Sequence, residues 1–236
     1  MKLLMIRHAD PDYPNDTITA QGHREAQALA QALKQRGRYD RIYSSPINRA
    51  VHTAQYTADA MQSSVILQPW AAELSCPATD ANGALLAGWD VPGETVRSNY
   101  PVLDHAAYMA QPPYSAFSPR IEQVRTDSDA FFLRHGYKRE GGVYRIVEPN
   151  QECNLLFCHL GFGMTLLSVL LELPLPLVWS GFFLPPSSVT TIVMEQRSAE
   201  LAVPRCVGLG DVSHLRLADL SVSNAGLNIH SSESPL

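Results

Sequence analysis

The sequence lacks the features that mark several large classes of protein. It holds only 18 Lys and Arg residues against 23 Asp and Glu residues, which gives a net charge of −5. General nucleic-acid-binding proteins carry an excess of positive charge, so we expect no nucleic-acid partner. Long apolar runs are also missing, because the longest, around 164–175, is interrupted by Glu172 and by prolines. We therefore expect no membrane-spanning segment and no membrane partner.

Cysteine is scarce, and the four present (Cys76, Cys153, Cys158 and Cys206) show no CxxC pairing. That pattern is typical of reduced thiols, and the opening MKLLMIRHAD is too short in apolar residues for a signal peptide, so we expect a cytoplasmic protein. The eight histidines are not paired at the short spacings that metal ligands favour. GxSxG, Walker and GxGxxG motifs are absent. We therefore expect neither a metal nor another cofactor.

Apolar runs of strand length alternate with segments of helical periodicity along most of the chain. Strands are expected at 2–6, 41–44, 65–67, 143–147, 155–159, 189–194 and 201–207. Helices are expected between Thr19 and Gly37, from Pro46 to about Met61, from Ile121 to about Gly136, and over 163–173. This alternation predicts an α/β fold: a three-layer sandwich in which helices cover both faces of a mostly parallel sheet.

The segment from Ser75 to about Pro119 has no clear periodicity and is rich in Pro, Gly, Asn and aromatic residues. Long segments of this kind inside compact domains are usually lids or binding loops. We therefore expect one domain over 1–236, with an irregular inserted region at about 75–140 that caps the substrate site. The Ser- and Asn-rich segment beyond Asn224 is predicted to be frayed.

Polar side chains follow three of the predicted strands. Arg7 and His8 end the first strand, Arg49 lies one turn into the helix after the second, and His159 ends the strand at 155–159. Ligands bind beyond the carboxyl ends of parallel strands, so we expect these side chains to converge. Taken singly, each has an ordinary interpretation: a surface pair, an exposed ion-paired arginine, a core histidine. All of these ordinary interpretations would have to be true at once for side chains that converge on one crevice. We therefore favour a catalytic site.

The chain resembles branch 1 of the histidine phosphatase superfamily, which is also called phosphoglycerate mutase-like. The resemblance rests on five segments in the family's order: LLMIRHAD, TAQGHREAQALA, YSSPINRAVHTA, the glutamate of AAELS, and LLFCHLGFG. It covers roughly the first sixty residues and again the region around 153–173. It implies a phosphoric monoester hydrolase of the histidine acid phosphatase type that acts on a small-molecule phosphate ester.

The resemblance also implies roles for individual side chains. His8 is the expected nucleophile, because neutral imidazole attacks phosphorus and the phosphohistidine is labile enough for water to hydrolyse it. Arg7 and Arg49 are forked, permanently charged donors for the phosphoryl oxygens, and they lower the pKa of His8. His159 is expected to add a donor, preferably as imidazolium. Glu73 is the expected general acid.

The chain departs from the family pattern at several positions. Asp10 stands where the family has glutamate, so it competes with Glu73 as the expected proton donor. Leu160 replaces the glycine that usually follows the second histidine, and we expect it to narrow the substrate pocket or to displace a phosphate-binding N–H. Thr19 and Asn15 match, or nearly match, family positions that line the pocket, and both are expected to contact substrate.

Three functions remain open at this point. The favoured one is a phosphomonoesterase; the others are a phosphoglycerate-type mutase and a catalytically weak, phosphate-binding regulatory protein. A mutase must hold a second anionic group, yet residues 74–119 contain a single basic residue, Arg97. Retention of two histidines and two arginines disfavours the regulatory protein. The physiological substrate and the oligomeric state stay open.

Overall fold

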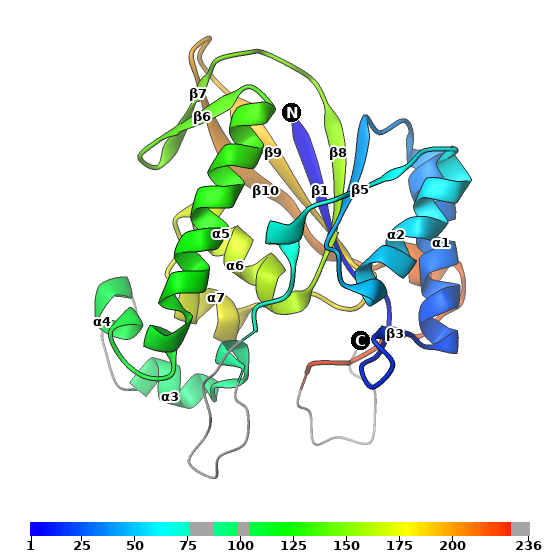
Figure 1. Cartoon of the computed structure of the whole chain (residues 1–236), viewed down its shortest axis with the longest axis horizontal. Helices are drawn as coiled ribbons and strands as arrows, with labels where there is room; N and C mark the ends of the chain where they lie inside the picture. The colour runs from blue at the N-terminus through cyan, green and yellow to red at the C-terminus, as the bar shows by residue number, and fades with distance from the viewer. Residues whose placement is uncertain (76–86, 99–103, 228–236) are drawn as a thin grey trace.

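The computed structural model describes residues 1–75, 87–98 and 104–227 (Figure 1). Its centre is a sheet with the strand order β5-β4-β8-β1-β9-β10-β7-β6. The parallel part consists of β5 (Val65–Leu67), β4 (Arg41–Ser44), β8 (Cys153–Cys158) and β1 (Lys2–Arg7). The sheet continues with antiparallel strands, β9 (Val189–Gln196), β10 (Leu201–Asp211), β7 (Val143–Ile146) and β6 (Tyr137–Glu140).

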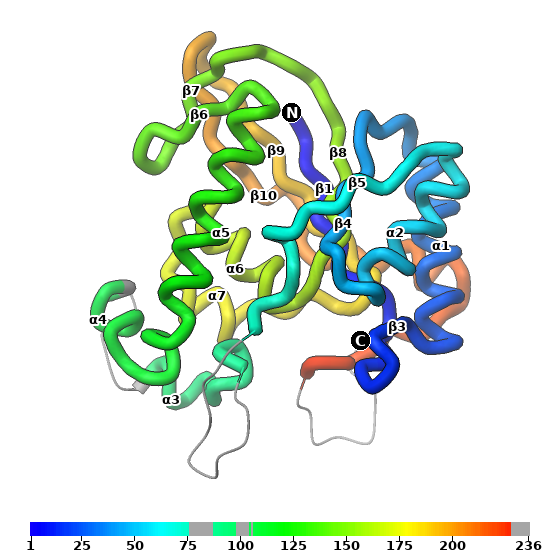
Figure 2. The backbone as a smooth tube through the Cα atoms, in the orientation of Figure 1, coloured from blue at the N-terminus to red at the C-terminus, as the bar shows by residue number. Residues whose placement is uncertain are grey.

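Helices cover both faces of this sheet (Figure 2). One face carries α1 (Ala20–Arg36), α2 (Asn48–Met61) and α8 (Ser213–Leu217). The other carries α5 (Tyr114–Arg134), α6 (Leu160–Leu171) and α7 (Leu175–Gly181). The predicted α/β fold, with helices on both sides of the sheet, is confirmed.

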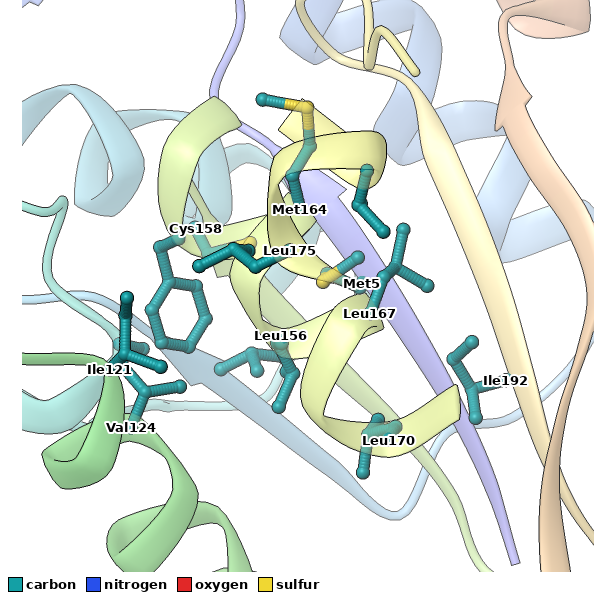
Figure 3. Packing of buried hydrophobic residues seen from close by; sticks show 14 of the residues in the cluster. Met5, Ile121, Val124, Leu156, Cys158, Met164, Leu167, Leu170, Leu175 and Ile192 are labelled. Atoms are coloured by element: carbon teal, nitrogen blue, oxygen red, sulfur yellow. The ribbon is translucent and has the colours of Figure 1, made fainter. Parts of the chain in front are cut away.

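Strand β1 is buried on both faces, and its side chains alternate between two apolar cores because successive residues of a strand point to opposite sides. Leu4 and Ile6 pack with the residues of α1 and α2, whereas Met5 belongs to the core under α5 and α6. Figure 3 shows Met164 and Leu167 of α6 beside Met5 in that second core. Two cores of this kind hold the end of β1, and therefore Arg7 and the residue after it, in one place.

Helix boundaries near the strand ends differ in part from the prediction. Helix α1 lies between Thr19 and Gly37 as predicted, and Thr19 caps it, since its hydroxyl accepts a hydrogen bond from the Gly22 N–H at 3.0 Å. Helix α2 begins at Asn48, two residues after Pro46, and Ser45 is not its cap. Helix α6 begins directly after His159, three residues earlier than predicted. His159 is therefore the N-cap residue of α6, which ties its position to that helix.

Several elements were not predicted from periodicity. They are the hairpin β2 (Pro11–Asp12) and β3 (Thr17–Ile18), the strand β6, the helix α7, the 3₁₀ turns η1 (Pro69–Ala71) and η2 (Gly88–Asp90), and the helices α3 (Gly93–Ser98), α4 (His105–Met109) and α8. Where described, the inserted region is therefore partly helical rather than irregular throughout. Aromatic packing explains this: Trp179 makes ring contacts with Trp89, Tyr114 and Phe117. Such contacts between distant residues stabilise short helices that leave no periodic pattern.

Three of the four cysteines, Cys153, Cys158 and Cys206, are free thiols, and Cys76 lies outside the described residues. Within residues 1–75, 87–98 and 104–227, no helix is long and apolar enough to cross a membrane.

Candidate active site

The carboxyl ends of the parallel strands bring the predicted side chains together. Arg7 is the last residue of β1 and His8 follows it, while His159 follows the neighbouring strand β8. The rings of His8 and His159 lie 5.2 Å apart between centroids. Arg49 lies in the first turn of α2, close enough to both histidines to lower the pKa of each. We call Arg7, His8, Arg49 and His159 the histidine–arginine cluster.

His8 is held by three backbone contacts. Its N–H donates to the Cys158 carbonyl at 2.9 Å, and its own carbonyl accepts from the Ser187 N–H at 3.0 Å. Its Nδ1 lies 2.8 Å from the Ala9 carbonyl oxygen, so Nδ1 carries the proton and Nε2 keeps a lone pair. Burial, followed by the charges of Arg7 and Arg49, lowers the pKa of His8 well below its ordinary value. The ring is therefore neutral and has a free nucleophilic nitrogen.

Arg7 is 2% exposed and is clamped by backbone carbonyls. Its Nη1 donates to Leu184 at 2.7 Å and its Nη2 to Ala225 at 2.8 Å. The Phe183 ring packs against the guanidinium, with Cζ 5.6 Å from the ring centroid. The buried Nε has no hydrogen-bond partner among the described residues. The orientation of the Arg7 guanidinium is thus fixed, and its Nε–H stays free to bind a ligand.

Arg49 is bound by two residues of the hairpin formed by β2 and β3. Its Nη1 lies 2.8 Å from Oδ1 of Asp16, and its Cζ lies 5.5 Å from the centroid of the Tyr13 ring. The edge of that ring approaches His8, with centroids 6.5 Å apart. Sequence reasoning missed both Tyr13 and Asp16, because a two-residue strand pair carries no periodic pattern. The aromatic residue five positions after His8 was the available signal.

His159 is oriented by Ser45. The Ser45 hydroxyl oxygen accepts from the Ile47 N–H at 3.2 Å and lies 2.8 Å from Nε2 of His159. When the hydroxyl proton is donated to Nε2, the ring proton lies on Nδ1, and this is the tautomer that would offer a donor to an oxyanion. Burial, then the charges of His8, Arg49 and Arg7, lowers the pKa of His159 well below its ordinary value. His159 is therefore neutral here, not the imidazolium expected for the bound state, and still offers an Nδ1–H donor.

Three buried nitrogen atoms of the cluster have no partner among the described residues: Arg7 Nε, Arg49 Nε and His159 Nδ1. Buried donors without acceptors are destabilising and uncommon in folded proteins. A tetrahedral oxyanion would supply acceptors to all three. The cluster therefore has the donors, the positive charge and the free His8 Nε2 that a bound phosphoryl group requires.

Glu73 lies beside the cluster, in the loop after η1, and binds the first turn of α6. Its Oε1 accepts from the N–H groups of Leu74 at 2.9 Å and Phe162 at 2.7 Å, and its Oε2 accepts from Gly161 at 3.1 Å. Burial raises the pKa of the carboxyl, although these N–H donors and Arg7 act in the opposite direction. One lone pair of Oε2 remains for a proton, and two amides of α6 that could have faced a phosphate are occupied.

Three further predicted residues have other contacts. Thr19 caps α1 and donates to Asp10 at 2.7 Å; the other Asp10 oxygen accepts from Ser223. Asn15 is exposed, and its side-chain amide donates to Asp12 at 2.9 Å. The structure therefore places neither Thr19 nor Asn15 in the cluster: one is used as a helix cap, and the other lies in the exposed turn between β2 and β3.

The segment after α8 returns to the site instead of fraying directly after Asn224. The Ala225 carbonyl accepts from Arg7. A Cβ added at Gly226 would lie 3.1 Å from Leu160 Cδ2 and 3.3 Å from Arg7 Nη2. Leu160, the first residue of α6, is 5% exposed and its side chain thus lies against this segment, near Arg7. The prediction of a frayed segment is wrong for 225–227, because backbone contacts that composition does not reveal hold these residues; the rest of the predicted segment, 228–236, lies outside the described residues.

The fold is shared with solved phosphatases. A mutant phosphoserine phosphatase from Entamoeba histolytica with bound phosphoserine has a TM-score of 0.63 at 20% identity, covering 91% of this chain and 98% of that one. Mycobacterial glucosyl-3-phosphoglycerate phosphatase gives 0.61 at 18% identity, with 89% and 98% covered. A putative alpha-ribazole-5'-P phosphatase from Escherichia coli K-12 gives 0.56 at 18% identity, with 90% and 97% covered. At these identities the likeness establishes the fold.

A comparison of the sequence with protein-family models adds to this likeness of fold. The family model described as histidine phosphatase superfamily (branch 1) matches residues 3–80, a stretch that contains Arg7, His8, Arg49 and Glu73. This match confirms the resemblance to branch 1 of the histidine phosphatase superfamily. No curated protein matches the chain in sequence.

Proposed function

We propose that the protein is a phosphomonoesterase of the histidine phosphatase type, which hydrolyses small phosphate monoesters through a phosphohistidine on His8. The observation that carries this proposal is the free Nε2 of His8 beside three buried, unpartnered donors from Arg7, Arg49 and His159. A nucleophile next to an unoccupied set of oxyanion donors suits phosphoryl transfer, in which alignment and charge stabilisation do most of the catalysis.

In the first step, Nε2 of His8 attacks phosphorus and the bond from phosphorus to the ester oxygen breaks. The Nδ1–H donated to the Ala9 carbonyl orients the ring for this attack. Arg7, Arg49 and the Nδ1–H of His159 bind the equatorial oxygens and stabilise their charge. In the second step, water attacks phosphorus, the phosphorus–nitrogen bond breaks, and inorganic phosphate leaves a neutral His8.

The departing alcohol needs a proton, and we propose that Glu73 supplies it from Oε2. Burial raises the pKa of this carboxyl, and an incoming phosphate dianion favours the protonated form further. Asp10 is the weaker candidate, since its oxygens bind Thr19, the cap of α1, and Ser223, whereas Glu73 binds the first turn of α6, directly after His159. In the second step the Glu73 carboxylate accepts a proton from the attacking water.

The remaining parts of the proposal follow from this chemistry. The region at about 75–140 is proposed to cap the substrate within a single domain, and the substrate partner is a small-molecule phosphate ester rather than a nucleic acid. A cytoplasmic location is proposed from the free thiols. For the mutase alternative, the described structure offers little support: Arg120 donates to the carbonyls of Trp70 and Ala72, and Lys138 lies on the remote strand β6.

Replacement of the nucleophile tests the proposal. His8→Ala should lower kcat/KM for 4-nitrophenyl phosphate on the order of 10⁴-fold or more, because no other group in the cluster forms the covalent species. His23→Ala is the matched control, since His23 is an exposed histidine of α1. Rapid quenching of the wild-type enzyme into alkali should trap an acid-labile phosphoprotein. A folded His8→Ala protein with wild-type turnover would refute the proposed function.

A further inference from the structure

A cavity of about 540 Å³ adjoins the histidine–arginine cluster. Leu160, Phe183 and Gly226 line it; the Phe183 ring packs against the Arg7 guanidinium, and a Cβ added at Gly226 would lie 3.3 Å from Arg7 Nη2. This volume is typical of small-molecule sites. Leu160 also follows His159 directly, so the cavity lies beside the cluster, where the body of a phosphate ester bound at His8 would extend. We call it the aromatic cavity.

Aromatic rings form much of the cavity wall. Trp89, Trp179, Phe182 and Phe183 line it, and the first two pack edge to face with their centroids 5.9 Å apart. The faces of such rings carry negative charge density and attract cations, most strongly in tryptophan. The wall therefore suits a body that is apolar, cationic, or both.

The charged residues that line the cavity favour a cationic substrate body over an apolar one. Asp90 and Glu94 are its charged lining residues, and no Lys or Arg is among the described residues that line it. Neither carboxylate is ion-paired with a described residue. Arg97, the basic residue of α3, is not among the lining residues, although its Nη2 would lie 3.8 Å from a Cβ added at Gly181, which stands between the lining residues Ser180 and Phe182. Partial burial raises the pKa of the Asp90 carboxyl, an effect that a nearby cation would reverse.

We propose that the substrate is a phosphate monoester whose body carries a positively charged nitrogen, either a protonated amine or a quaternary ammonium. The arginines bind the phosphate end, and the carboxylates of Asp90 and Glu94 with the aromatic rings bind the cationic end. This inference rests on the proposed function and adds the substrate class. Bodies with a carboxylate, such as 3-phosphoglycerate, meet like charge in the same cavity and are disfavoured.

Two substrates of the same shape, one with and one without a positively charged nitrogen, measure the effect of that charge on kcat/KM. Phosphocholine and 3,3-dimethylbutyl phosphate have the same shape, but the second has carbon in place of the charged nitrogen. The wild-type enzyme should prefer phosphocholine by about tenfold or more in kcat/KM, as expected for a cation held by aromatic faces and carboxylates. In Asp90→Asn/Glu94→Gln the ratio should fall below about threefold. The control Asp59→Asn/Glu122→Gln makes the same charge change on exposed helix positions and should keep the ratio.

The outcomes separate this inference from the proposed function. Hydrolysis of both esters with a ratio near one would overturn the inference and leave the phosphatase in place. A preference for phosphocholine that survives Asp90→Asn/Glu94→Gln would also overturn it, because the cation would then lie elsewhere. If neither ester is hydrolysed, the proposed function fails. Calorimetric binding of the two esters to His8→Ala then decides the inference alone: preferential binding of phosphocholine supports it and equal binding refutes it.

Discussion

Glu73 has two separable roles in this structure, and Glu73→Gln distinguishes them. As a carboxylate, Glu73 accepts three backbone N–H groups, two of them from the first turn of α6. A glutamine keeps one oxygen and places an NH₂ group where the other was. The better orientation keeps the oxygen on Leu74 and Phe162, so that the NH₂ group opposes the Gly161 N–H.

The loss of stability in Glu73→Gln follows from the unpaired N–H of Gly161. Losing one hydrogen bond to a charged acceptor and leaving its donor unpaired destabilises a protein by about 1.5–3 kcal/mol. For a chain of this size each kcal/mol lowers Tm by about 2–4 °C. We therefore expect Glu73→Gln to lower Tm by about 3–12 °C, measured by thermal unfolding. This loss is independent of the substrate.

The cost to catalysis depends on the substrate. A general acid contributes about 10²–10⁴-fold when the leaving group is poor and much less when it is good. Glu73→Gln should therefore lower kcat/KM by about 10²-fold or more for an alkyl phosphate and by less than about tenfold for 4-nitrophenyl phosphate. Both constants are measured on one preparation, below its Tm. Equal losses on the two esters would refute the proton-donor role, leave Glu73 as the cap of α6, and make Asp10 the next candidate.

Three other changes test separate parts of the structure. Ser45→Ala removes the hydrogen bond to His159 Nε2, so kcat/KM should fall about tenfold and ¹⁵N NMR should show a changed tautomer of the His159 ring; an unchanged tautomer would contradict this. Because the pKa of His8 is held well below 6.5, its nucleophilic form persists as the pH falls, and kcat/KM should show no acid limb above pH 6.5. Although burial acts to raise it, hydrogen bonds from neighbouring side chains lower the pKa of Glu152 to about 2. The stability from Glu152 is then fully present above its unfolded pKa of about 4.3 and is lost as the pH falls toward 2. Because solvent screens this partly exposed carboxylate, urea unfolding should show that Glu152→Gln costs on the order of 1 kcal/mol at pH 7 and much less near pH 2.

The convergence of the cluster could be predicted because it follows from local patterns. Arg7, His8 and His159 come directly after apolar strands that the sequence shows clearly, and neighbouring parallel strands end at the same edge of a sheet. Arg49 follows because the helix after β4 begins at the same edge. Nothing beyond strand identity and strand direction was needed for these four residues.

Side-chain direction was harder to predict than position. Thr19 and Asn15 lie near the cluster in sequence, but a threonine before a helix is also the preferred cap, and that role uses the Thr19 hydroxyl here. Ser45 shows the reverse case. The sequence Ser45-Pro46 predicts a helix start, yet the Ser45 hydroxyl binds His159 and α2 begins later. A local rule is set aside at the position where the site needs the side chain.

The hydrogen bonds that hold the Arg7 guanidinium could not be predicted from residue types, because both acceptors are backbone carbonyls, those of Leu184 and Ala225. Any residue type provides a carbonyl, so composition suggests only a polar, frayed segment. Gly226 is the residue in this segment whose type reflects the close packing around Arg7. Its φ of 88° lies in the left-handed region, and a Cβ there would press on Leu160 and on the Arg7 guanidinium. The segment that orients the guanidinium of Arg7 also contributes Gly226 and Leu227 to the lining of the aromatic cavity, so the same few backbone atoms support the proposed phosphate site and border the proposed site of the substrate body.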